Sequence, residues 1–124
     1  MSIHIKKDAD HGFVDIEVSG SITEEVAQQA RVECVKLLQD MPRPLVLVDI
    51  SRGVSRLSIS EIYDVPEKWN TTGLPRNMRL ALVAPPHSIS LENARFYENV
   101  ARNRGWIVQV LADRDSAIQW LTTD

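Results

Sequence analysis

The C-terminal stretch from Asn103 to Leu121 constrains the fold more than any other part of the chain. It reads as the end of a helix, a buried strand over 106–112, a turn and a short closing helix. Two further apolar strand candidates, 45–50 and 78–84, are each followed by turn residues and then by a helical pattern. Strands that alternate with helices predict right-handed crossovers and a mostly parallel sheet.

The N-terminal residues predict an antiparallel hairpin that adds to this sheet. Apolar and polar residues alternate over 3–6 and 14–18, with a turn over 8–12, and the second strand is expected to stop at Ser19 and Gly20. Helices are expected over 24–40 after caps at Ser21 or Thr23, and from Ser58 toward Pro66. Two more are expected, one from the capping residues Ser88 and Ser90 to just before Gly105 and one from Asp113 to Leu121. Residues 66–75 are read as a second helical turn plus loop. The predicted fold is therefore α/β over a single domain, 1–124, with about five strands and about four helices.

The charge and the apolar runs argue against a nucleic-acid-binding or membrane-spanning protein. The net charge is −3 with both signs interspersed, so no continuous positive field favours nucleic acid as a partner. Since no apolar run approaches the roughly 20 residues of a membrane span and the N-terminus lacks a signal-peptide core, we predict a cytoplasmic protein with no membrane span. Cys34 lies on the apolar stripe of the 24–40 helix and is predicted to be a small core residue.

The order and spacing of several short motifs resemble the SpoIIAA-like branch of STAS domains, and the likeness covers nearly the whole chain. The motifs that carry this resemblance are 19–25, 45–51, 79–84, 104–113 and 117–121. The same branch is similar in layout to lipid-binding CRAL-TRIO domains. The resemblance implies a non-catalytic module that binds a protein or a small ligand and needs no cofactor.

The family resemblance also implies a place for regulation by phosphorylation. In the antagonist proteins of this family, a partner kinase phosphorylates a serine in an Asp-Ser-Ser/Thr-Gly motif at the start of the second helix. The corresponding stretch here, Arg56 to Glu61, lacks both the aspartate and the glycine. Only Ser58, or less readily Ser60, could occupy the switch position. Ser58 and Glu61 also fit a helix-capping box, which is a purely structural role.

The carboxyl ends of the central strands predict a second candidate site, because ligands of open α/β sheets lie outside these ends. Helix N-termini and arginine side chains there would suit an anion; alternatively, the serines cap helices and the arginines are solvated. An aspartate at the end of a strand can bind a ligand, or can cap the turn that follows. The candidate ligand- or partner-binding residues are Asp49, Ser51, Arg52, Arg56, Ser58, His87, Ser88 and Ser90.

Catalytic and metal-binding motifs are weakly supported. His87 lies near Ser88 and Ser90, but the chain has no Gly-x-Ser-x-Gly elbow and no triad order typical of a hydrolase. The three histidines lack the spacing of metal ligands, and no Gly-rich phosphate loop is present. We therefore predict that the protein is not an enzyme and holds no metal.

Two functions follow from these observations. The first is a STAS-like protein-interaction module with a regulatory role, which forms a homodimer through Tyr63, Trp69 and Leu74; Trp69 could equally be a core residue. The second is a carrier or sensor for an apolar or anionic small molecule or lipid. A large enclosed apolar cavity would favour the carrier, whereas a flat exposed patch around Tyr63 and Trp69 would favour the interaction module.

Overall fold

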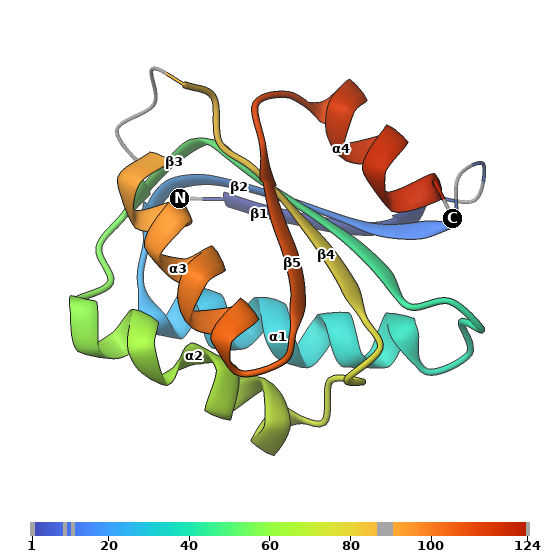
Figure 1. Cartoon of the computed structure of the whole chain (residues 1–124), viewed down its shortest axis with the longest axis horizontal. Helices are drawn as coiled ribbons and strands as arrows, with labels where there is room; N and C mark the ends of the chain where they lie inside the picture. The colour runs from blue at the N-terminus through green and yellow to red at the C-terminus, as the bar shows by residue number, and fades with distance from the viewer. Residues whose placement is uncertain (1, 9, 11, 87–90, 124) are drawn as a thin grey trace.

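The computed structural model describes residues 2–8, 10, 12–86 and 91–123, which form a mixed five-stranded sheet with helices on both faces (Figure 1). The first strand pairs antiparallel with the second and all other neighbours are parallel, so the predicted α/β class is confirmed. In spatial as in chain order, the strands are β1 (Ser2–Asp8), β2 (Phe13–Ile22), β3 (Leu45–Ser55), β4 (Arg79–Val83) and β5 (Ile107–Leu111).

The helices cover the two faces of the sheet unequally, as Figure 1 shows. One face carries α1 (Glu24–Leu38), α2 (Ile59–Thr72) and α3 (Leu91–Asn103), whereas the other carries α4 (Arg114–Thr122), which packs mainly on β3 and β4. Within residues 2–123, apart from the undescribed positions, no helix combines the length and the apolar character that a membrane crossing requires.

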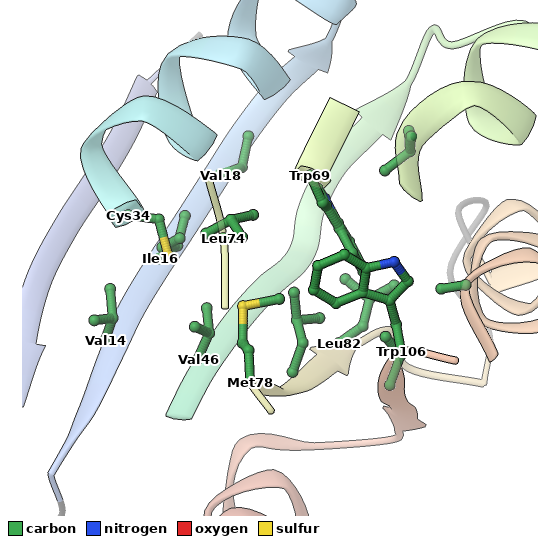
Figure 2. Close-up of a cluster of buried hydrophobic side chains, with 14 of the residues drawn as sticks. Val14, Ile16, Val18, Cys34, Val46, Trp69, Leu74, Met78, Leu82 and Trp106 are labelled. Atoms are coloured by element: carbon green, nitrogen blue, oxygen red, sulfur yellow. The ribbon is translucent and has the colours of Figure 1, made fainter. Parts of the chain in front are cut away.

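The alternation of residues along β2 divides the core into two parts. Val14, Ile16 and Val18 belong to the larger part, between the sheet and α1–α3, and Figure 2 shows them beside residues of α1, α2 and β3. Phe13 points the other way and packs under α4 with Leu121. The same alternation places Asp15 and Glu17 on the α4 side of the sheet.

The aromatic residue proposed as an interface anchor lies in the larger core. Trp69 is only 2% exposed and Leu74 is 7% exposed, so neither can anchor an interface in the folded protein, and the core alternative for Trp69 is correct. The Trp69 ring meets that of Trp106 edge to face, with centroids 4.9 Å apart (Figure 2). It also meets the ring of Tyr97, with centroids 5.5 Å apart. Of the three predicted interface residues, Tyr63 alone is exposed, at 55%.

Both β2 and β3 run past the ends predicted for them. The expected stops at Ser19–Gly20 and at Ile50 are wrong, because parallel pairing continues from Ser19 opposite Arg52 to Ile22 opposite Ser55. A side chain at Gly53 would approach Ile22 Cδ1 to 2.6 Å, so glycine permits the close contact within this ribbon. The Ser-Arg-Gly sequence at 51–53 is typical of a turn. These residues adopt an extended conformation because β3 pairs there with β2.

The second helix runs through Pro66 to Thr72, so the second helical turn expected within 66–75 is present and continues the same helix. Pro66 lacks the backbone N–H that an interior helical position uses, but Val65, Pro66 and Trp69 are all buried against the core. This packing holds the helix together across the proline. Gly73, at φ 97°, then ends the helix in a left-handed conformation and donates its N–H to the carbonyls of Trp69 and Asn70.

The helix signals read from the sequence are largely confirmed. Thr23, Ser58 and Asp113 cap α1, α2 and α4 with their side chains, and Gly105 has the positive φ of 87° expected after α3. Cys34 is buried on the apolar side of α1, as predicted. The expected caps Ser88 and Ser90 lie outside the described residues.

Candidate functional site

The carboxyl ends of the strands form an open polar pocket of about 520 Å³ beside the N-terminus of α4. Three predicted candidates, Asp49, Ser51 and Arg52, meet there. The complete lining is His4, Glu17, Val18, Ser19, Asp49, Ser51, Arg52, Val83, Pro85, Ala112, Asp113 and Arg114. A role for these residues in binding stays a prediction.

Arg114, at the start of α4, joins three carboxylates of β2 and β3 at one side of this pocket. Its guanidinium lies 2.5 Å from Asp15 Oδ2, 3.2 Å from Asp49 Oδ2 and 3.5 Å from Glu17 Oε1. Asp15 is 2% exposed, which makes it a buried charge that depends on Arg114. Sequence reasoning missed both residues, because Asp15 alternates like a residue of a solvated strand face and Arg114 looks like a surface residue of a turn.

Asp49 is occupied by partners within the protein. Its Oδ1 accepts hydrogen bonds from the Ser51 backbone N–H at 3.0 Å and from the Ser51 hydroxyl at 2.6 Å. Burial alone would raise the pKa of Asp49, but these hydrogen bonds, together with the hydrogen bond and positive charge of Arg114, outweigh it and lower the pKa below its usual range. Asp49 therefore holds β3 and α4 together, and because β3 continues to Ser55 the turn that Asp49 was predicted to cap does not follow it.

The lowered pKa of Asp49 predicts a loss of stability in acid. Its ionised form contributes stability that is complete above the unfolded pKa of about 3.9 and disappears as pH falls through the lower folded pKa. We expect Asp49→Asn to reduce the free energy of unfolding at pH 7 and to flatten its decline below pH ~4. Urea titrations at several pH values test this. Asp40→Asn, which changes an exposed carboxyl after α1, is the control. If the free energy of unfolding of Asp49→Asn declines below pH ~4 as steeply as that of the original chain, the lowered pKa of Asp49 is contradicted.

Arg56 and Ser58 lie away from this pocket. Because β3 continues as far as Ser55, the chain travels roughly 20 Å along the strand between Asp49 and Arg56, at about 3.3 Å per residue. The rim predicted from the sequence is therefore divided into two separate places. The remaining candidates, His87, Ser88 and Ser90, lie outside the described residues.

Ser58 forms the capping box at the start of α2. Its Oγ accepts a hydrogen bond from the Glu61 backbone N–H at 3.1 Å, and its own backbone N–H donates to Glu61 Oε1 at 2.9 Å. Ser58 and Ser60 are both exposed. Phosphorylation of either residue stays a prediction.

Substitution of Ser58 by alanine is expected to lower the free energy of unfolding by about 0.5–2 kcal/mol, because the Glu61 N–H loses its side-chain acceptor. Chemical denaturation measures this loss. Ser60→Ala removes a neighbouring exposed hydroxyl and should cost less than about 0.5 kcal/mol. Equal effects of the two substitutions would show that the capping box contributes nothing.

A second cavity, of about 130 Å³ and partly open, lies between the sheet and the three-helix layer. Side chains from β2, β3, β4, α1, α2 and α3 line it, and they are almost all apolar. Several residues that Figure 2 labels, including Cys34, Trp69 and Leu82, belong to this lining. The polar members are Arg31, Ser55, Asn93 and Tyr97.

The cavity opens toward the carboxyl ends of the strands. Its half-buried lining residues concentrate where the helices of this layer begin, and they include Ile22, Ile50, Leu57 and Asn93. Strands β2 and β3 extend over this end of the cavity, so the unpredicted ribbon forms part of its wall. The sequence contains no signal for the cavity, because it depends on how far the helices stand from the sheet.

Cys34 provides a chemical probe of this cavity. Burial raises the pKa of its thiol to about 12, so thiolate is scarce at neutral pH. We expect Cys34 to resist 5,5′-dithiobis(2-nitrobenzoate) at pH 8 in the folded protein and to react stoichiometrically in urea. Complete reaction within seconds in buffer alone would mean that the cavity wall at α1 is open to large polar reagents.

Comparison with known proteins identifies the fold. No protein-family model and no curated protein matches the chain. Among solved structures, the chain is similar to a protein of the DUF3478 family from Shewanella loihica PV-4, which is described as uncharacterized and as having a SpoIIAA-like fold. The TM-score is 0.64 with 19% sequence identity, over 97% of this chain and 92% of the other. The chain therefore has a SpoIIAA-like fold, in agreement with the resemblance seen in its sequence.

Proposed function

We propose that this protein binds a small, largely apolar ligand in the cavity between the sheet and α1–α3, and acts as a carrier or sensor. The observation that carries the proposal is the cavity itself, about 130 Å³ and walled almost entirely by apolar side chains; it is smaller and less enclosed than the cavity expected of a carrier, which limits the proposal to a small ligand. An engineered apolar cavity of roughly 150 Å³ in another protein remains dry and binds benzene. A benzene-sized ring or a short hydrocarbon chain thus matches the space.

Energetics support occupation of this cavity. At ~24 cal/mol per Å³, a closed and empty space of this volume costs on the order of 3 kcal/mol, because the lining atoms lose van der Waals partners, and this is the upper limit for a partly open cavity. A ligand that fills the space recovers part of this free energy. Its opening at the carboxyl ends of the strands is also where ligands of open α/β sheets enter.

Toluene binding tests the proposal. We expect saturating toluene to raise the midpoint of thermal unfolding, since a ligand at 100 times its Kd adds about 2.7 kcal/mol of stability. Ala30→Leu places a larger side chain in the cavity wall on α1 and should abolish the rise. Ala112→Leu makes the same chemical change at an exposed position after β5 and should retain it. No rise in the original chain, or an equal rise in both variants, would refute the proposal.

A second function, self-association through α2, has one specific observation in its favour. Ile59 and Tyr63 are 72% and 55% exposed and lie one helical turn apart on α2. Arg104 lies over the Tyr63 ring, 4.5 Å from its centroid, which orders this aromatic side chain at the surface. A dimer would bury these apolar groups, in keeping with a protein-interaction module.

Sedimentation equilibrium tests this second function. A dimer requires a mass near twice the 14.0 kDa of the chain, and Tyr63→Glu should shift it to monomer. Val32→Glu introduces the same charge at an exposed apolar position on α1 and serves as the control. A chain that stays at 14.0 kDa at high concentration has no dimer to explain.

A further inference from the structure

A buried arginine interrupts the apolar wall of the cavity. Arg31, on α1, is 6% exposed and lines the cavity. Its Nε donates to Gln28 Oε1 at 2.9 Å, and its Nη2 donates to Glu24 Oε1. A guanidinium has five N–H donors, so within the described part of the chain these two bonds leave three donors available, two of them on Nη1.

The charges around Arg31 do not balance. Glu24 Oε1 is shared with Lys68, whose Nζ lies 3.0 Å away, so two cations meet a single carboxylate. Lys68 is 37% exposed and is not part of the cavity lining, so water screens its charge; Arg31 is the cation buried at the apolar wall, and an anion there would pair with its unused donors.

Tyr97 adds a polar group beside the same charges. Its hydroxyl lies within the electrostatic reach of both Arg31 and Glu24, and it also belongs to the cavity lining. Burial raises the pKa of Tyr97 well above its usual value, so the hydroxyl keeps its proton and remains a hydrogen-bond donor. The polar part of the cavity therefore presents donors to an incoming group.

We infer that the ligand is a carboxylate, whose anionic head binds Arg31 and Lys68 while its apolar part fills the cavity. This inference rests on the proposed function. The guanidinium of arginine matches the planar carboxylate and can bind it with two parallel N–H···O bonds. The small volume restricts the apolar part to one aromatic ring or a short chain.

Two probes of the same shape test the inference, 3-phenylpropionate and 3-phenylpropan-1-ol, with binding measured by calorimetry at pH 7. We expect the acid to bind at least tenfold more tightly than the alcohol. Arg31→Met should reduce this preference to less than about twofold while binding of the alcohol persists, and Arg31→Lys should retain part of it. Equal binding of the two probes by the original chain would overturn the inference and leave the proposed function intact, whereas no binding of either would overturn both.

A milder variant covers the case in which Arg31→Met does not fold. Lys68 is partly exposed, so Lys68→Gln should fold and reduce the preference for the acid about threefold. Lys36→Gln makes the same change in charge at the exposed end of α1, where Lys36 pairs with Glu33, and should leave the preference unchanged. A preference that survives Lys68→Gln undiminished, or that falls equally in both variants, would place the carboxylate elsewhere.

Discussion

Replacement of Arg114 by methionine is expected to lower the free energy of unfolding by about 3 kcal/mol. The change leaves Asp15 buried without its counter-charge, and breaking one side of a buried ion pair costs about 3–5 kcal/mol. The Arg114 side chain is 34% exposed, so solvent screening places the expected loss at the lower end of that range. Urea denaturation at pH 7 measures the loss.

Two further variants separate this ion pair from general surface effects. The double variant Arg114→Met with Asp15→Asn removes both charges and should recover much of the stability. Lys36→Met breaks the exposed pair with Glu33 and should cost less than about 1 kcal/mol. A loss below 1 kcal/mol in Arg114→Met would mean that Asp15 reaches water in solution.

Replacement of Trp69 by alanine should cost about 3–5 kcal/mol, because the indole is 2% exposed and packs against Trp106 and Tyr97. The substitution also enlarges the cavity that Trp69 lines. Chemical denaturation followed by circular dichroism gives the free energy of unfolding without relying on the fluorescence of the missing indole.

Tyr63→Ala is the matched control for Trp69, since it truncates an exposed aromatic residue of the same helix. It loses the contact with Arg104 and should cost less than about 1 kcal/mol. A larger loss of stability for Tyr63→Ala than for Trp69→Ala would contradict the assignment of Trp69 to the buried face of α2 and of Tyr63 to the exposed face. If Trp69→Ala does not fold, Trp69→Phe can replace it. This variant retains an aromatic ring, so we expect a smaller loss of stability.

The resemblance to SpoIIAA-like domains and the fold agree over nearly the whole chain. Even so, Arg31 and Arg114 lie outside the motifs that carry this resemblance, whereas part of the cavity lining, such as Val46 and Leu80, lies within them. Arg31 falls between the apolar positions of α1, and Arg114 follows the capping residue of α4. These two arginines are therefore not part of the strand–helix pattern that carries the resemblance.

By itself, the sequence determined the elements and their class. Apolar periodicity, the caps at Thr23, Ser58 and Asp113 and the glycine after α3 are local signals, and each depends on residues a few positions apart. The burial of Cys34 followed from the same periodicity, because one apolar stripe of a helix must face the core.

Only the tertiary structure decided where the candidate residues meet. Pairing of β2 with β3 beyond β4 separated Ser58 from Asp49, and the place of α4 over the sheet brought Arg114 to Asp15. The size of the cavity depends on the distance between the helices and the sheet. These features arise from contacts between residues far apart in the chain, and a local pattern of hydrophobic and polar residues carries no information about such distances.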